Sequence, residues 1–214
     1  SGGMDSCVTA SYAKKDGYSL AFLHVNYGQR TEKKELEAFN NLGDSFNVKD
    51  RLIVDMKYLS KIGGSCLTDY NIKVPKGNLN NDEIPISYVP FRNANILSAA
   101  VSWGEIIEAK AIYIGAVEED SSGYPDCRKS FYESFNNSIN EGTKPETNIK
   151  IVTPLINLTK KEIIKTGKRL QSPLHLTWSC YESISTPCLK CDSCLLRIKG
   201  FKEAKITDPI LNKT

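Results

Sequence analysis

The chain has 214 residues and a formal net charge of +3, with 40% hydrophobic and 25% charged residues. These values are typical of a globular chain that forms one large domain, or one domain with a small appendage. No apolar run approaches the ~20 residues of a membrane span, and no signal peptide is visible. The small charge argues against direct nucleic-acid binding, and the crowding of four of the seven cysteines favours a reducing cytoplasm.

The first six residues, SGGMDS, lead directly into an apolar, helix-like segment. Gly2 and Gly3 lack a Cβ, so their backbone can take positive φ and approach a ligand closely. N–H groups at a helix start, with the helix dipole behind them, form a cradle for phosphate or pyrophosphate. Ser1 and Ser6 can add hydroxyl donors, and Asp5 can hold Mg²⁺. The pattern is not a Walker A loop, and a plain turn before a helix is the alternative.

The hydrophobic pattern predicts alternating helices and strands along the rest of the chain. Helices are expected over 4–15, from a Thr31 cap to about 46, from an Asn93 cap to about 109, from about 128 to 142, and from a capping box at 159–162. Buried strands are expected over 19–26, 52–54, 111–117 and 149–152. Inward positions on two helices are Leu36, Phe39, Leu42 and Phe46, and Ile96, Leu97, Ala100 and Ile107. Residues 63–83 read as a long loop, for which a lid over the site is one role.

This alternation favours a doubly wound α/β fold, in which a mostly parallel sheet carries helices on both faces. Ligands bind at the carboxyl ends of the strands in such folds, where residues 1–6 would lie. Because a loop of this kind normally follows a strand, we expect an apolar strand upstream of Ser1. We divide the chain into a nucleotide-binding domain, 1–170, and a C-terminal segment, 171–214, packed on it.

The C-terminal segment carries four cysteines at metal-ligand spacing: Cys180, Cys188, Cys191 and Cys194. Four thiolates match a tetrahedral zinc site with no open position, which predicts a structural metal whose binding energy adds to folding energy. An iron–sulfur cluster and four unrelated buried cysteines are the alternatives. Cys7, Cys66 and Cys127 lack such partners and are expected to pack in the core.

Two short motifs follow strands or begin helices, where active-site residues are often found. Arg30 ends the NYGQR motif and can bind phosphate or carboxylate with two parallel hydrogen bonds. Arg92 lies in YVPFRN at a helix start, again a geometry that binds anions. A solvated turn and a surface arginine on a capped helix are the respective alternatives.

The loop after the strand predicted over 111–117, EEDSSGYPDCR, gathers acidic groups, an aromatic ring and an arginine over 118–128. Gly and Pro interrupt this charge run, which favours a pocket wall over a solvated face. Its carboxylates can accept the N–H groups of a guanine-like edge, and Tyr124 or Phe91 can stack on the ring. His24 is expected to be a satisfied core residue, and His175 a residue without a ligand or catalytic role.

The SGGMDS segment resembles the signature of the PP-loop ATP pyrophosphatases, which cleave ATP between its α and β phosphates. Together with NYGQR, VPFRNANILS, GAVEEDSSGYPDCR, FYESFN and CYESISTPCLKCDSCLLRIKGF, it resembles the 7-cyano-7-deazaguanine synthase family of queuosine biosynthesis. These stretches span nearly the whole chain. Two residues depart from the family pattern: Thr31 replaces an expected basic histidine, and Phe91 a frequent glycine.

The resemblance implies an adenine nucleotide alpha hydrolase-like fold and a cytoplasmic, homodimeric ligase. It would form a carbon–nitrogen bond by converting 7-carboxy-7-deazaguanine and ammonia to the nitrile, through adenylated carboxylate and amide intermediates. ATP would be cleaved to AMP, with Mg²⁺ at the phosphates and one structural Zn²⁺ per chain. No nucleic acid or membrane would bind directly, and an amidotransferase partner that supplies ammonia stays an alternative.

Carried over residue by residue, the resemblance suggests three sets. The nucleotide-binding set is Ser1, Gly2, Gly3, Met4, Asp5, Ser6 and Arg30. The catalytic set is Asp5, Ser6, Arg92 and Asp120. The substrate-binding set is Tyr27, Phe91, Asn93, Tyr124, Asp126 and Arg128.

Three other functions fit part of the pattern. A PP-loop tRNA sulfurtransferase should show a basic face or an added RNA-binding domain. Another ATP-dependent enzyme that forms amides through adenylates would share the phosphate loop. A zinc-ribbon interaction protein explains the four cysteines alone.

Overall fold

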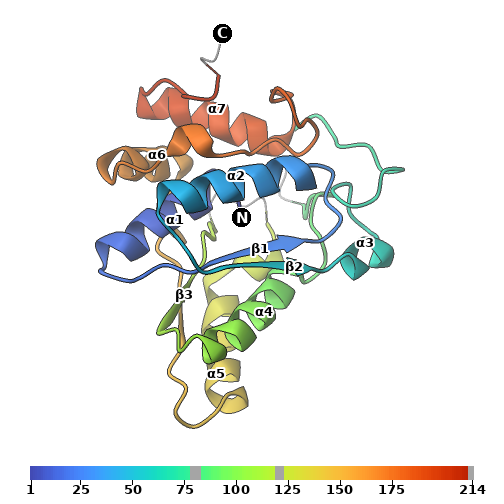
Figure 1. Ribbon diagram of the computed structural model, residues 1–214. Helices are drawn as coiled ribbons and strands as arrows, with labels where there is room; N and C mark the ends of the chain where they lie inside the picture. Colours follow the sequence, from blue (N-terminus) through green and yellow to red (C-terminus); the bar gives the residue numbers. More distant parts are fainter. Residues whose placement is uncertain (78–82, 119–122, 212–214) are drawn as a thin grey trace.

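Figure 1 shows the computed structural model, which describes residues 1–77, 83–118 and 123–211. The helices are α1 (Met4–Lys15), α2 (Glu32–Ser45), α3 (Tyr58–Ile62), α4 (Arg92–Ile106), α5 (Lys129–Gly142), α6 (Lys160–Arg169) and α7 (Asp192–Ala204). The strands are β1 (Phe22–Asn26), β2 (Arg51–Asp55), β3 (Ala111–Tyr113) and β4 (Lys150–Val152). Two short 3₁₀ helices are η1 (Pro125–Cys127) and η2 (Leu174–Leu176).

The strands form two parallel pairs, β1 with β2 and β3 with β4. In the first pair Phe22 lies opposite Arg51, and in the second Ala111 lies opposite Lys150. Helices α1 and α2 lie on one side of β1 and β2, and α4 lies on the other (Figure 1). The predicted α/β class, with parallel strands and helices on both faces, is confirmed.

The two strand pairs are not joined within the described ranges, because β1 and β3 do not pair with each other. Residues of both strands instead line a cavity of about 790 Å³, which also reaches the first residues of the chain. The strand expected upstream of Ser1 stays a prediction. Within residues 1–77, 83–118 and 123–211, no helix is long and apolar enough to cross a membrane.

Helix α4 begins differently from the prediction. Phe91, not Asn93, is the residue before the helix, and it has a left-handed backbone with φ 56°. Asn93 lies inside the first turn, and its side chain hydrogen-bonds η1 instead of capping the helix. Ile107, expected to face inward, is 39% exposed because α4 ends at Ile106.

Several strands and helix ends follow the predicted pattern with shorter bounds. β3 spans three residues of the predicted 111–117 stretch, although Ile114 still donates its N–H to the Val152 carbonyl at 3.0 Å. The capping box at the start of α6 is confirmed, since Thr159 and Glu162 bond each other's backbone N–H groups. Leu36 is half-buried, and the rest of its predicted apolar face, Phe39, Leu42 and Phe46, packs in or against the core.

The C-terminal helix packs on the body of the fold through α6. A Cβ on Gly200 of α7 would lie 2.7 Å from Lys160 Cβ, so the two helices approach too closely for any larger residue there. Ile163 and Ile164 of α6 and Phe201 of α7 belong to one buried cluster, which also contains Val8 of α1. These helices therefore share a single hydrophobic core.

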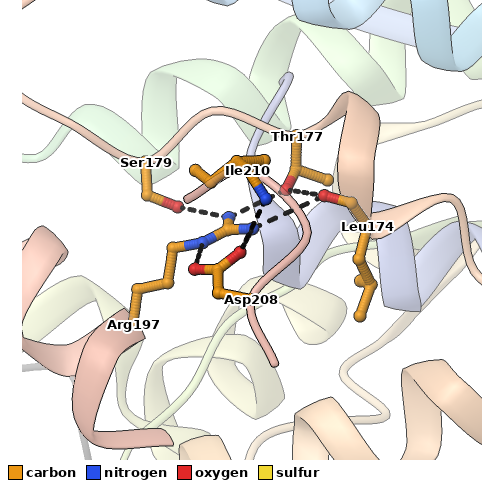
Figure 2. Close-up of polar contacts among 6 residues, drawn as sticks. All are labelled: Leu174, Thr177, Ser179, Arg197, Asp208 and Ile210. Atoms are coloured by element: carbon orange, nitrogen blue, oxygen red, sulfur yellow. Dashed lines mark hydrogen bonds and ion pairs between the residues drawn. The ribbon is translucent and has the colours of Figure 1, made fainter. Parts of the chain in front are cut away.

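A buried ion pair fixes the segment between η2 and the cysteines (Figure 2). The Arg197 guanidinium donates to both Asp208 carboxylate oxygens, at 2.6 and 2.9 Å, and both side chains are 4% exposed. It also donates to the Thr177 hydroxyl at 2.9 Å and to the Ser179 hydroxyl at 3.2 Å. One side chain of α7 thus holds both the C-terminal loop and the approach to Cys180.

We predict that Asp208→Ala lowers the free energy of unfolding by about 3–5 kcal/mol, because it leaves a buried guanidinium without its carboxylate. Urea denaturation followed by far-UV circular dichroism measures the change. The control is Glu37→Ala, which removes the partially exposed Lys34–Glu37 pair and should cost under about 1 kcal/mol. Equal losses in the two variants would contradict the structural importance of Arg197.

Candidate active site

The phosphate loop forms a small polar cradle at the start of α1. Ser1 Oγ accepts a hydrogen bond from the Gly3 N–H at 3.1 Å, and the Ser6 hydroxyl donates to the same oxygen at 3.1 Å. Two hydroxyls and a backbone N–H therefore converge where the positive end of the α1 dipole points. This arrangement can take a phosphate by exchanging internal hydrogen bonds for bonds to the ligand.

Gly2 of this loop serves packing, and neither Gly2 nor Gly3 takes the positive φ that their lack of a Cβ allows. Gly3 has φ −78°, and neither glycine is among the described residues with positive φ. A Cβ on Gly2 would lie 2.5 Å from Ala38 Cβ and 2.6 Å from the Glu35 carbonyl oxygen. Gly2 is therefore needed because the loop lies directly against α2.

A lysine that the sequence analysis did not single out lies at the phosphate loop. Lys160 Nζ is 2.7 Å from Asp5 Oδ2, and the two side chains are 13% and 28% exposed. A cation at the first residue of α6 opposes the helix dipole, so its position calls for a compensating anion. Asp5 Oδ1 is buried and makes no hydrogen bond in the described part of the chain. This orphaned carboxylate oxygen is of the kind that Mg²⁺ takes as a ligand.

A wall of tyrosines surrounds the Arg92 guanidinium in the same cavity. Arg92 donates to the Tyr27 hydroxyl at 3.1 Å, and its guanidinium carbon lies 5.2 Å from the centre of the Tyr27 ring. Tyr124, 7% exposed, shares a 2.8 Å hydrogen bond with the Ser87 hydroxyl. Burial raises the pKa of Tyr27 and of Tyr124, which keeps both hydroxyls neutral hydrogen-bonding groups. Tyr181 lines the cavity beside them.

Asp126 and Asn93 hold the start of α4 through reciprocal bonds. Asp126 Oδ2 accepts the Asn93 N–H at 2.9 Å, and the Asn93 amide donates to the Asp126 carbonyl at 3.0 Å. Asp126 is 3% exposed, and burial raises the pKa of its carboxyl. Because Arg92 precedes Asn93, this pair holds the backbone next to Arg92 in place. The predicted contact of Asp126 and Asn93 with substrate stays a prediction.

Five of the described residues in the predicted nucleotide, substrate and catalytic sets do not line this cavity: Gly2 and Asp126, described above, and Arg30, Phe91 and Arg128. Arg30 donates to the carbonyls of Cys66, Asp69 and Ile72, each at 2.7 Å, so it braces the 66–72 loop. Arg128 is exposed at the start of α5, and Phe91 is 59% exposed and packs against Phe131. Asp120 lies outside the described residues. The roles predicted for these six residues stay predictions.

The long loop was predicted as irregular, and its described part contains neither helix nor strand. Besides the bonds from Arg30, it reaches the cysteine segment, where the Gly77 N–H donates to the Lys190 carbonyl at 2.8 Å. The loop therefore runs from the NYGQR motif to the C-terminal segment.

The four predicted cysteine ligands come together as a candidate metal site. Their Sγ atoms all lie within 4.8 Å of one another, which fits a metal such as zinc held by thiolates. The Cys180 sulfur accepts N–H groups from Glu182, Ser183 and Cys188 at 3.3–3.4 Å. Such donors stabilise a thiolate, the form that binds metal.

The remaining cysteines and the histidines do not form a catalytic set. Burial raises the pKa of Cys7 to about 12 and that of Cys127 to about 11, so neither thiol ionises readily. His24 is buried and bonds Asn26 Oδ1 at 2.8 Å, but its Nδ1 has no partner in the described ranges. Only one of its two ring nitrogens therefore has a hydrogen-bond partner among the described residues, where both were expected to have one. Burial lowers the pKa of His24 to about 4. His175 is exposed outside the cavity.

We predict that Asp126→Ala lowers the free energy of unfolding by about 1 kcal/mol, because α4 loses the acceptor for its Asn93 N–H. Asp126→Asn keeps an acceptor and removes a charge whose burial is costly. Burial raises the folded-state pKa of Asp126 above its usual value of 3.8. The wild-type protein therefore loses stability as pH rises through the folded-state pKa, because the buried carboxyl must then carry a charge. The stability of Asp126→Asn relative to wild type should therefore increase with pH in urea denaturation. A larger loss for Asn than for Ala would contradict this role.

The comparisons with known proteins agree on one family. The family model described as queuosine biosynthesis protein QueC matches residues 1–205. A Chlorobaculum parvum protein named 7-cyano-7-deazaguanine synthase is 56% identical over 210 residues, which cover 98% of this chain and 92% of that protein. Proteins of the same name from Chlorobium phaeobacteroides and Chloroherpeton thalassium are 56% and 55% identical, with 98% of this chain and 93% of each relative covered. The chain therefore belongs to the QueC family of queuosine biosynthesis proteins.

Proposed function

We propose that this chain converts 7-carboxy-7-deazaguanine and ammonia to 7-cyano-7-deazaguanine in queuosine precursor synthesis, using ATP. The observation that carries the proposal is one cavity that joins a phosphate cradle to a partly buried arginine among tyrosines. A nucleotide and a planar acid can therefore meet there. The name of the relatives supports the product, and the cradle supports the nucleotide.

The proposed reaction needs two activations by ATP. The substrate carboxylate oxygen attacks the α phosphorus of ATP, and pyrophosphate leaves. Ammonia then attacks the carbonyl carbon, AMP departs with the bonding electrons, and loss of a proton gives the amide. The amide oxygen is adenylated in the same way, and departure of AMP with loss of the nitrogen protons gives the nitrile. We infer a carbon–nitrogen ligase that forms AMP.

The residues of the cradle bind and neutralise the nucleotide in this proposal. The Gly3 N–H and the hydroxyls of Ser1 and Ser6 hold the phosphates that leave as pyrophosphate. Lys160 lies 2.7 Å from Asp5, which places its ammonium group beside the cradle. There it can donate a charge-assisted hydrogen bond to a bound phosphate. Asp5 would offer its orphaned oxygen to Mg²⁺, which supplies charge neutralisation at the phosphates.

Arg92 and the tyrosines hold the acid in this proposal. The guanidinium can bind the substrate carboxylate and stabilise charge that develops on it during adenylation. The Tyr27 hydroxyl accepts from the guanidinium and limits its orientation, while Asn93 and Asp126 fix the backbone behind it. Tyr124 offers a ring face and a hydroxyl to the heterocycle.

Zinc at the four cysteines, a homodimer and a cytoplasmic location complete the proposal. Four thiolates with no further ligand suit a structural metal that contributes to folding. The three cysteines outside the cluster are buried, which disfavours a sulfur carrier and hence a tRNA sulfurtransferase. We propose that the site takes up free ammonia, without an amidotransferase partner.

The test is mass spectrometry of the products that the protein forms from 7-carboxy-7-deazaguanine, Mg·ATP and ammonium. We expect the nitrile and AMP, with no requirement for tRNA. ADP in place of AMP would contradict the adenylation chemistry. AMP formed only after tRNA is added would favour a sulfurtransferase instead.

We predict that Lys160→Met weakens ATP binding by about 10–100-fold, the loss expected for a charge-assisted hydrogen bond of about 1.5–3 kcal/mol. AMP binding should change little, because AMP lacks the phosphates that Lys160 would contact. Isothermal titration calorimetry with both nucleotides measures the difference. Lys161→Met, at the exposed neighbouring position, is the matched control and should bind ATP like the wild type. Equal weakening of ATP and AMP would contradict a role at the outer phosphates.

A further inference from the structure

Tyr181 belongs to two sites at once. It directly follows Cys180 in the candidate metal cluster, and its side chain packs against the buried cysteines. It also packs against the apolar cluster that contains Val25 and Tyr27, and it lines the cavity that holds Arg92. Of the residues between Cys180 and Cys194, only Tyr181 and Ser193 line this cavity.

The Cys180 sulfur fixes the backbone on both sides of Tyr181. It is a candidate metal ligand on the N-terminal side, and it accepts the N–H groups of Glu182 and Ser183, at 3.4 and 3.3 Å, on the C-terminal side. Tyr181 therefore lies in a tight turn closed around one sulfur atom. A bound metal would hold this sulfur at a defined place and the turn with it.

The residues that precede Cys180 are tied to the phosphate loop. The Trp178 N–H donates to the Gly2 carbonyl at 2.9 Å, and the Ser179 hydroxyl accepts from Arg197 at 3.2 Å. The route from α7 to Cys180 is thus fixed against the nucleotide end of the cavity. Tyr181 enters the cavity next to these contacts, at the Arg92 end.

Tyr181 lines the cavity together with Tyr27, Tyr124 and Arg92, and it packs against the cluster that contains Tyr27. Three tyrosines around one guanidinium provide ring faces, hydroxyls and a single positive charge. This combination suits a planar, polar heterocycle that carries a carboxylate.

We propose that Tyr181 binds the deazapurine acid through its hydroxyl, and that the metal at the four cysteines sets the position of Tyr181. The metal cluster then governs affinity for the acid as well as folding of the C-terminal segment. The inference rests on the proposed function, because the acid is the substrate assigned there. It makes Tyr181 a substrate-binding residue and Cys180 a positioning residue.

The first test is Tyr181→Phe, which removes the hydroxyl and keeps the ring. We expect KM for 7-carboxy-7-deazaguanine to rise about 5–10-fold, the effect of one hydrogen bond, with KM for ATP and zinc content unchanged. Ile184→Ala, on the exposed side of the same loop, is the control and should match the wild type in all three measurements. An unchanged KM for the acid in Tyr181→Phe would overturn the proposal.

The second test measures binding without turnover. Preparations of wild-type protein with graded zinc content are titrated with the acid and, separately, with ATP by calorimetry. We expect the stoichiometry of the acid to follow zinc content while that of ATP does not. Full acid binding at low zinc content would overturn the proposal, and so would parallel loss of acid binding, ATP binding and the circular dichroism of the fold. Wild-type protein with full zinc that neither binds nor converts the acid would instead refute the proposed function.

Discussion

The buried contact between Arg197 and Asp208 is the interaction on which the assembly of the site depends. It crosses 11 positions of sequence to close the C-terminal loop on α7, and it also holds Thr177 and Ser179. Trp178, between these two residues, bonds the Gly2 carbonyl of the phosphate loop. A charge pair whose arginine lines the cavity thus helps to determine where the segment before Cys180 meets the phosphate loop. Burying such a pair is costly, which is consistent with a demand for defined geometry rather than for stability alone.

The site is composite, and its parts hold one another. The phosphate loop needs Gly2 because α2 lies against it, and a Cβ on Gly115 would come within 2.8 Å of the Asp5 carbonyl carbon. On the opposite wall, Asp126 supports the start of α4 and therefore Arg92. These residues need not contact a ligand to affect activity. Substitutions at such positions would change activity by displacing the residues that bind the ligand.

Local signals in the sequence predicted what is locally determined. The capping box at Thr159, the cysteine spacing and the start of α1 follow from residues within one or two turns of each other. Long-range contacts were not predictable in this way. Lys160 is separated from Asp5 by 155 positions, and no pattern around it distinguishes it from the adjacent lysine. Arg30 was assigned to phosphate from its place after a strand, whereas the structure directs its donors to three backbone carbonyls of a loop.

The two departures from the family pattern have physical consequences of different kinds. Phe91 occupies a left-handed position at φ 56°, which glycine adopts freely and other residues adopt at a cost of about 1–2 kcal/mol. Its side chain lies outside the cavity and packs on Phe131. The substitution therefore destabilises the start of α4 but does not alter the tyrosines that line the cavity. Thr31 is buried and donates to Glu35 Oε1 at 2.7 Å, and Glu35 lines the cavity. A neutral hydroxyl at position 31 does not compensate the negative charge of Glu35, whereas a histidine cation would. Of the two departures, Thr31 is therefore the one that changes the electrostatics of the site.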